Sequence, residues 1–469
     1  MIEPMGLDEK YTRFEIDEES VGYEKPENCG CEKLSQFRKL ALVFLGAGGL
    51  VLTLVWTNAI GFRGTWLALL LPLSLLGVGS VFFLRDKYEG KSAGIKNDGV
   101  LFSDASNRGW IGWVVAISLT VFYVGFYFDL PPGILDGGSR WVEPLSYAMR
   151  GQAGDKYFLY SFLYTLAVLV FGVRMLVRYR HNRYQILRTL SVMFFQTAFA
   201  FIIPQVLRAL EQPEFYPTYF WPLLPDMLFP SKVTDLSAHP GGLGVFMVVW
   251  GAVLAFVATP VLTYFYGKRW YCSWVCGCGG LAETLGDPYR HLSDKSTKAW
   301  KVERALIYPI LVAIVVLTLL LWIYPSSFSL GFRKIYGFVI VSMFAGVIGV
   351  GFYPLMGSRV WCRFGCPMAA YLGILQRFFS RFRITTNGAQ CISCGNCSTF
   401  CEMGIDVRAY AQKGQNIVRA SCVGCGVCAA VCPRGVLKLE NGSTLADRYE
   451  GADQPLNQFW RDLTQPPKA

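Results

Sequence analysis

The chain has 469 residues, of which 53% are hydrophobic, 15% aromatic and only 16% charged, whereas soluble domains carry about 25% charged residues. This composition excludes a chain built only of soluble domains, because a large part of it must face something other than water. The net charge of +11 would suggest nucleic acid as the partner of a soluble protein, but the basic residues crowd the ends of apolar runs, so a membrane is predicted and no nucleic-acid partner.

The first 39 residues are polar and are predicted to form a cytoplasmic arm. This arm contains Cys29 and Cys31, and their Cys-Gly-Cys spacing favours free cytosolic thiols over a metal or redox role. The apolar run that follows is not expected to be a signal peptide, because a long polar segment precedes it and no small-residue cleavage site follows a short apolar core.

Eight apolar runs are long enough to cross a bilayer, for which a helix needs about 20 residues. None of them contains Asp, Glu, Lys, Arg or His, and buried helices of a soluble protein rarely give eight such runs. The chain is therefore predicted to be a mostly α-helical, polytopic membrane protein. The predicted spans are approximately Leu40–Ile60, Trp66–Leu84, Trp110–Phe128, Tyr157–Val173, Thr189–Leu207, Leu243–Tyr266, Ala305–Tyr324 and Ile335–Leu355.

The loops on alternate sides of these spans differ in basic residues, with 17 Lys and Arg on one side and 8 on the other. The richer side is predicted to be cytoplasmic, because basic loops are retained there. With eight spans both termini are then cytoplasmic, and the expected location is the bacterial plasma (inner) membrane. Arg333 and Lys334 fall on the outer side and violate the rule weakly.

The sixth and eighth spans end in related sequences, GKRWYCSWVCG at 267–277 and GSRVWCRFGCP at 357–367. C-x3-C spacing puts the two thiols of each copy one helical turn apart. Two such pairs at equal membrane depth would supply four thiolates to one metal centre, and Arg269 and Arg359 would compensate their charge. The four predicted ligands are Cys272, Cys276, Cys362 and Cys366. The alternative is a duplicated packing corner with inert, buried thiols.

The first copy departs from the second in two ways, which leave its ligand set open. Gly277 stands where the second copy has Pro367, and an additional Cys278 follows. The metal is also open at this point: iron, as a single ion or a small cluster, fits a redox chain, whereas zinc cannot accept an electron.

Residues 391–432 repeat the spacing C-x2-C-x2-C-x3-C at an offset of 31 residues. This spacing is typical of bacterial two-cluster ferredoxins, in which the fourth Cys of each run binds the other [4Fe-4S] cluster. Zinc and disulfides are disfavoured, because zinc uses two paired ligand sets and the cytoplasm is reducing. Glu402 stands where the second run has Pro433. The predicted ligands are Cys391, Cys394, Cys397 and Cys432 for one cluster, and Cys422, Cys425, Cys428 and Cys401 for the other.

Haem is not predicted. Fifteen Cys against three His favour thiolate-bound iron, and no Cys-x-x-Cys-His sequence is present. His181, His239 and His291 all lie outside the predicted spans, so no pair is placed to bind a haem within the bilayer.

The two C-x3-C elements and the two-cluster ferredoxin spacing, which lie between Gly267 and Gly442, resemble membrane polyferredoxins of the NapH and NosR type and of the FixG/CcoG type. The stretch Cys-Glu-Met-Gly-Ile-Asp-Val-Arg at 401–408 is similar to the corresponding turn of the FixG type. The resemblance implies electron transfer with the quinone pool or a membrane redox partner, and for the FixG/CcoG type metal reduction and oxidase assembly. Eight spans are more than we expect of these families. The resemblance therefore implies no role for spans one to four.

The favoured function is a membrane-bound electron-transfer subunit of an oxidoreductase complex, with two [4Fe-4S] clusters and a thiolate metal site. Its expected partners are membrane lipid, other subunits and a quinone. The alternatives are a copper reductase or oxidase-assembly factor and a redox-sensing scaffold subunit. The predicted domains are a cytoplasmic arm (1–39), a four-helix membrane region of unknown role (40–177), a four-helix membrane region with the C-x3-C elements (178–366), a linker (367–385), a small α+β two-cluster ferredoxin domain (386–442) and a tail (443–469).

Overall fold

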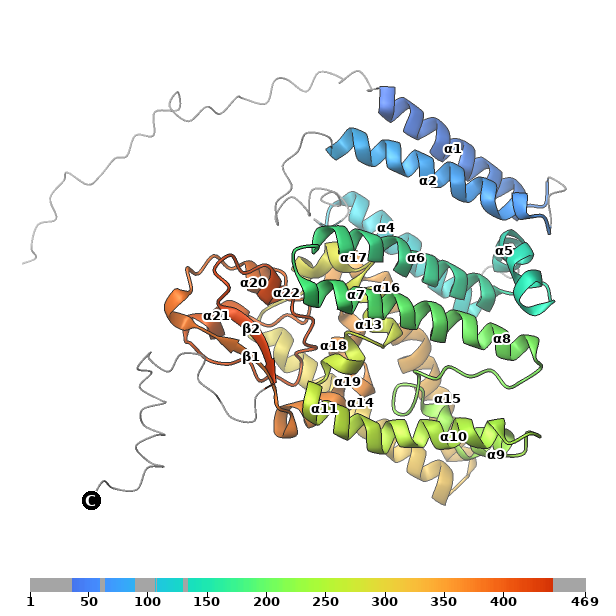
Figure 1. The fold of residues 1–469 in the computed structure, drawn as a ribbon. Helices are drawn as coiled ribbons and strands as arrows, with labels where there is room; N and C mark the ends of the chain where they lie inside the picture. The colour runs from blue at the N-terminus through green and yellow to red at the C-terminus, as the bar shows by residue number, and fades with distance from the viewer. Residues whose placement is uncertain (1–35, 60–63, 89–105, 107, 130–133, 442–469) are drawn as a thin grey trace, which may run out of the picture.

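The computed structural model describes residues 36–59, 64–88, 106, 108–129 and 134–441 (Figure 1). Within these residues, eight helices are long and apolar enough to cross a membrane. Each overlaps one predicted span, which confirms the polytopic helical fold class. Their bounds are Gln36–Trp56, Trp66–Phe83, Trp110–Phe128, Lys156–Arg178, Arg183–Ala209, Leu243–Tyr266, Thr297–Ile323 and Ser327–Gly351.

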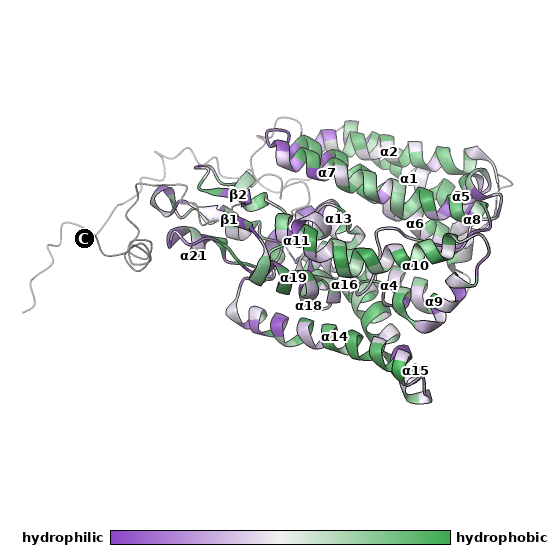
Figure 2. Ribbon diagram, turned by 60° about the horizontal axis from the view of Figure 1, so that its bottom comes forward, coloured by the Kyte–Doolittle hydropathy of each residue, from purple (hydrophilic) through white to green (hydrophobic). Residues whose placement is uncertain are grey.

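Five of these spans are regular α-helices made mostly of hydrophobic residues (Figure 2), and many of their large apolar side chains are exposed. A chain with this surface is suited to lipid, because lipid tails accept apolar side chains that water would not. These helices are α1 (Gln36–Trp56), α2 (Trp66–Tyr88), α4 (Trp110–Phe128), α6 (Lys156–Arg178) and α14 (Thr297–Ile323).

The other three spans contain wider π-helical turns. In two of them a proline, Pro204 or Pro260, follows the wide turn closely. A proline has no N–H and its ring crowds the preceding turn, and a local change to wider winding relieves that conflict. These spans are α7 (Arg183–Phe195), η2 (Gln196–Ile202) and α8 (Ile203–Ala209); α10 (Leu243–Val253), η4 (Leu254–Ala258) and α11 (Thr259–Tyr266); and α15 (Ser327–Tyr336), η6 (Gly337–Ile348) and α16 (Gly349–Gly351).

Helices α1 and α2 form a close pair at the edge of the bundle (Figure 1). A Cβ atom added to Gly48 would lie 2.9 Å from the Leu76 side chain, so glycine permits this approach. The amphipathic helix α5 (Ile134–Arg150) joins the pair to the other spans, because Trp141 and Val142 pack in one core with Val55 of α1. This helix occupies a segment that the sequence prediction treated as an outer loop.

Short helices gather near both ends of the spans and position the loops. They are η3 (Pro225–Leu228), α9 (Pro230–Ser237), α12 (Arg269–Cys272), α13 (Gly277–Glu283), η5 (Asp287–Leu292), α17 (Tyr353–Met356), α18 (Val360–Phe364) and α19 (Pro367–Phe379). Helices α12 and α18 each contain the first cysteine of one C-x3-C element, and α13 and α19 each begin directly after the second, so the two copies share one local fold.

The small C-terminal domain lies at one end of the bundle (Figure 1). Its strands β1 (Phe382–Thr386) and β2 (Leu437–Asn441) pair antiparallel, with Ile384 opposite Leu439. Its short helices are η7 (Gly388–Gln390), α20 (Asn396–Thr399), α21 (Val407–Gln412) and α22 (Val427–Ala430). One continuous buried core contains residues of this domain and of both C-x3-C elements, so the domain packs directly on the end of the bundle.

Candidate iron–sulfur sites

The C-terminal domain has two hollows lined by cysteines, and each contains one of the predicted crossed sets. One hollow is lined by Cys391, Cys394, Cys397 and Cys432, and is here called the distal site. The other is lined by Cys401, Cys422, Cys425 and Cys428, and is called the proximal site. In both sets, the fourth thiol comes from the opposite repeat.

The repeat produces this arrangement through two glycines. Gly395 and Gly426 precede α20 and α22 with φ of +80° and +74°, a left-handed conformation that residues with a Cβ atom adopt only at a cost. The turn lets each loop bend round its hollow before the short helix begins. At the proximal site the backbone N–H of Ile405 donates to the Cys401 sulfur at 3.4 Å, a contact that favours the thiolate form.

The two C-x3-C elements also bring their thiols together, into what is here called the membrane-edge site. Cys272 ends α12 and Cys362 lies in α18, while Cys276 and Cys366 are the N-caps of α13 and α19. All four side chains are buried in the core shared with the C-terminal domain. The structure therefore joins two parts of the chain that lie 90 residues apart.

Burial determines the charge of these thiols when no cation is bound. Desolvation raises the pKa of Cys272 to about 12, although Lys268 and Arg359 oppose the shift. Desolvation also raises the pKa of Cys362 and of Cys366. A thiol with so high a pKa ionises only when a metal cation binds the sulfur. The site is thus suited to hold metal rather than to react as a free nucleophile.

The mutual distance of ligand atoms is one criterion for a site that holds a single metal ion. A tetrahedral ion with metal–sulfur bonds of about 2.3 Å holds its sulfurs about 3.8 Å apart. Among the described residues, the only group of three or more ligand atoms within 4.8 Å of one another is Glu283, Glu402 and Cys425. None of the three cysteine sets forms a group of this kind among the described residues.

Positive charge beside the membrane-edge site comes from Arg359 and Lys268, and both side chains are only 1% exposed. The Arg359 guanidinium donates to the Cys362 sulfur at 3.6 Å and to the Cys272 carbonyl at 3.1 Å. Arg269, which the sequence also assigned to this role, lies elsewhere: it donates to Asn441 at 3.0 Å and stacks on Phe382. The adjacent Lys268 takes its place.

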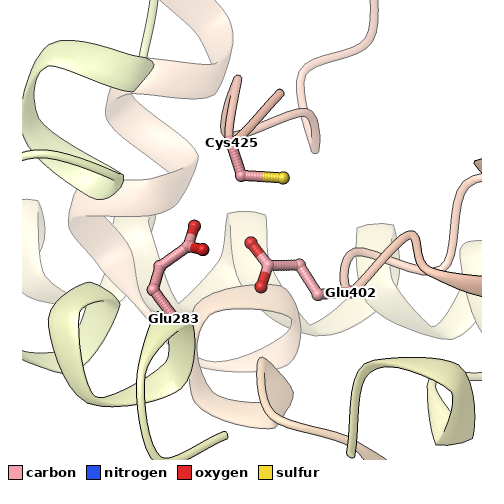
Figure 3. Close-up of side chains that lie close together, drawn as sticks. All are labelled: Glu283, Glu402 and Cys425. Atoms are coloured by element: carbon pink, nitrogen blue, oxygen red, sulfur yellow. The ribbon is translucent and has the colours of Figure 1, made fainter. Parts of the chain in front are cut away.

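A buried ion-pair network connects the membrane-edge and proximal sites, and the sequence analysis did not predict it. Figure 3 shows the carboxylates of Glu283 and Glu402 facing each other below the Cys425 thiol. Arg359 contacts Glu283 at 2.6 Å and Glu402 at 3.0 Å, and Arg290 contacts Glu402 at 2.6 Å. The sequence feature that could have indicated this network is Glu402, which stands where the second cysteine run has Pro433.

The charged side chains that surround Glu283 in this network are mostly arginines. Burial alone would raise the pKa of Glu283, but Arg188, Arg290 and Arg359 hold it well below its ordinary value. Asp287 is likewise paired with Arg290 at 2.7 Å. Charged groups this deeply buried persist only when they are paired, so the network fixes the C-terminal domain in one position on the bundle.

The first C-x3-C copy has glycine at position 277 because neighbouring polar groups approach it closely. A Cβ atom on Gly277 would lie 1.9 Å from the Tyr219 hydroxyl. The Tyr164 hydroxyl lies 2.8 Å from the Gly277 carbonyl oxygen and 2.9 Å from the Gln196 side-chain oxygen, and its single hydrogen can be donated to either. Cys278 lies within hydrogen-bond reach of Cys276, so it stays a candidate additional ligand. Cys29 and Cys31 lie outside the described residues.

The proximal site faces the bundle, whereas the distal site faces away from it. Ser273 donates to the Val423 carbonyl, Gln376 to the Cys422 carbonyl and Gln185 to the Cys425 carbonyl, each at 2.8 Å. At the distal site, by contrast, Cys394 is exposed and Ile392 is 58% exposed. The three cysteine sets therefore follow one another from the membrane edge to the exposed surface.

The family comparisons agree with this arrangement. Residues 383–433 match a 4Fe-4S dicluster domain, and residues 249–296 and 336–385 both match a 4Fe-4S binding domain. The second match occurs twice and covers the two C-x3-C elements. The duplication found in the sequence therefore coincides with two matches to one 4Fe-4S binding domain.

Three relatives are similar over part of their length. YccM of Escherichia coli strain K12, provisionally named an electron transport protein, is 28% identical over 38% of this chain and 58% of YccM. MauN of Methylobacillus flagellatus, a methylamine utilization ferredoxin-type protein, is 29% identical over 32% of this chain and 55% of MauN. An uncharacterized protein of Methanocaldococcus jannaschii is 25% identical over 34% of this chain and 63% of its own length.

The chain thus spans less than two thirds of each of these relatives. No solved structure matches it. The 4Fe-4S domain matches, the eight apolar helices among the described residues and the similarity to these proteins are consistent with a membrane polyferredoxin-type protein.

Proposed function

We propose that the chain is a membrane-bound subunit that passes electrons between a quinone pool or membrane redox partner and other redox centres. The observation that carries the proposal is the series of three cysteine sets, which share one buried core and lead from the membrane edge to an exposed surface. The electron-transport name of YccM supports the same reading.

In this proposal the eight cysteines of the C-terminal domain hold two [4Fe-4S] clusters, in the crossed sets of the proximal and distal sites. The membrane-edge site holds a third iron–sulfur centre on Cys272, Cys276, Cys362 and Cys366. An iron–sulfur cluster, when bound, accepts and releases single electrons. The chain's own contribution is to space the three sites, to exclude water from the inner two and to supply compensating charge through Arg359 and Lys268.

The orientation belongs to the same proposal. The excess of basic residues in one set of loops supports a cytoplasmic C-terminal domain in the bacterial plasma membrane. The distal site then faces the cytoplasm, where a soluble or membrane-attached redox partner would contact the surface around Cys394 and Ile392. The membrane-edge site lies at the depth where a quinone or a partner subunit would exchange electrons.

The family match at the two C-x3-C elements makes this proposal preferable to a copper reductase. Residues 249–296 and 336–385, which contain the four thiols, both match a 4Fe-4S binding domain.

The test is the iron content and the reduction of the purified full chain. Three cubanes require about 12 iron atoms per chain, against about 8 for the ferredoxin domain alone. The variants Cys276→Ser and Cys362→Ser should both lower the iron content by the same amount. Both should also keep the two ferredoxin clusters but lose their reduction by a quinol or membrane donor. The variant Cys29→Ser is the matched control, because it also removes one thiol and Cys29 belongs to none of the three cysteine sets. A wild-type content of 8 iron atoms, with normal cluster reduction in both variants, would show that the C-x3-C thiols only pack.

A further inference from the structure

A cavity of about 240 Å³ lies between the start of α14, helices α18 and α19, and the loop that precedes Cys422. Cys362 of the membrane-edge site forms part of its wall, and Ser421 forms another part. The cavity therefore adjoins the membrane-edge and proximal sites without being either of them, and neither the family comparisons nor the proposed function assigns it a role.

The wall of this cavity is strongly cationic. Its charged residues are Lys268, Arg304, Arg363, Arg377, Arg419 and Glu303. The single carboxylate, Glu303, is already engaged, because Arg363 donates to it at 2.9 Å and the Ser421 hydroxyl also bonds to it. Four positive charges around one small cavity are left without a carboxylate partner among its wall residues.

Three arginines at the cavity contact only aromatic rings through their guanidinium groups. Within the described part of the chain, Arg304 and Arg419 both lie over Trp300, at 5.1 and 4.4 Å from the ring centroid, and Arg377 lies over Phe378. Stacking leaves the N–H groups at the edges of a guanidinium available to a ligand. Planar donors of this kind suit the oxygens of a phosphate.

Two buried cations in the wall have unused donors. Arg363 is 3% exposed, and its Nη2 atom has no hydrogen-bond partner. Lys268 is 1% exposed, and its ammonium group donates only to the Ala420 carbonyl, at 3.2 Å. A buried donor without an acceptor is destabilising, so its occurrence beside a polar cavity points to a ligand that supplies the acceptor.

Apolar side chains near the basic residues place the cavity at the depth of lipid headgroups. Val302 and Leu306, on the same first turns of α14 as Arg304, are 50% and 42% exposed, and Phe378 beside Arg377 is 68% exposed. Basic pockets between membrane helices at this depth bind anionic headgroups. A neutral quinone ring would leave the charges of Arg304, Arg377 and Arg419 uncompensated.

We propose that this cavity binds a phosphate group, carried by an anionic phospholipid or by a soluble phosphate compound. The volume is below the range of about 300–1,000 Å³ of sites for drug-sized ligands, and it suits a headgroup rather than a nucleotide cofactor. Because Cys362 shares the wall, a bound anion also lowers the reduction potential of a centre at the membrane-edge site.

The experiment measures binding to the purified full chain in a non-ionic detergent, by calorimetry. One arm titrates inorganic phosphate and glycerol 3-phosphate. A second arm titrates dispersed phosphatidylglycerol, with phosphatidylcholine as the zwitterionic comparison. The test variant is Arg304→Gln with Arg377→Gln, since both side chains are exposed and make no ion pair in the described structure. The matched control is Lys298→Gln with Lys301→Gln, which removes the same charge from exposed positions of α14 outside the cavity.

The expected result is saturable binding of a phosphate-bearing anion, weakened at least about tenfold in the test variant and unchanged in the control. Binding of phosphatidylglycerol alone identifies a lipid ligand, and binding of free phosphate identifies a soluble one. The proposal is overturned if no anion binds saturably, if both variants lose affinity equally, or if phosphatidylcholine binds as tightly as phosphatidylglycerol. Iron content and cluster reduction are measured on the same samples. The absence of phosphate binding can therefore be distinguished from a failure of the proposed electron transfer.

Discussion

Replacing Arg359 with glutamine should destabilise the protein far more than the same change at its counterpart in the first C-x3-C copy, Arg269. The Arg359 guanidinium is 1% exposed and holds Glu283 at 2.6 Å and Glu402 at 3.0 Å. Removing one partner of a buried ion pair leaves an uncompensated charge and costs about 3–5 kcal/mol. Arg269 makes one hydrogen bond and ring contacts near the surface, together worth about 1 kcal/mol.

The assay compares the unfolding of the two variants and the wild type in one detergent, followed by circular dichroism. A second readout is the reduction potential of the membrane-edge centre, measured by redox titration. The potential should fall in Arg359→Gln, because the lost positive charge stabilised the reduced form, and it should stay nearly unchanged in Arg269→Gln. Equal destabilisation by the two changes would refute the reasoning, since it would mean that the buried network contributes no more than a surface contact.

Three further predictions concern other parts of the chain. Cys401→Ser should abolish the proximal cluster and spare the distal one, which electron paramagnetic resonance can measure. Loss of the distal cluster instead would refute the crossed assignment. A reporter fused at Asn182 should be active only in the cytoplasm and one at Pro225 only outside, and the reverse pattern would overturn the orientation. Gly277→Ala should lower the unfolding free energy by about 1–3 kcal/mol through overpacking, because its Cβ would lie 1.9 Å from a tyrosine hydroxyl. Gly46→Ala is its control, since nothing lies within 4 Å of that Cβ position.

Features with a local signal could be predicted from the sequence. The eight spans follow from the length of uninterrupted apolar runs, which is a property of neighbouring residues. The crossed cysteine sets follow from a spacing that a short loop and one helical turn reproduce. The convergence of Cys272 with Cys362 required a repeat to be noticed, because no local property connects residues 90 positions apart.

Features that depend on tertiary packing could not be predicted in the same way. The sequence predicts a basic cytoplasmic loop for the segment that contains Glu283 and Arg290. Only the folded chain buries these two residues against Glu402. Arg269 and Lys268 are adjacent in sequence, and nothing local decides which of them faces the thiols. Helix α5 is a different case. Trp141, Val142 and Leu145 of this helix recur at helical spacing, so its apolar face was visible in the sequence but is shorter than a span.

The position of the C-terminal domain over the membrane-edge site has a consequence for how the protein is made. The four thiols of that site come from the ends of two spans, so the site exists only after both spans have entered the bilayer. Once the domain has docked through Ser273, Gln376 and the buried ion pairs, these thiols are sealed from solvent. Under the proposed function, iron delivery to the membrane-edge site would have to precede docking, or the domain would have to lift to admit it. Maturation would then have an order, in which insertion comes first, metal loading second and closure of the domain last.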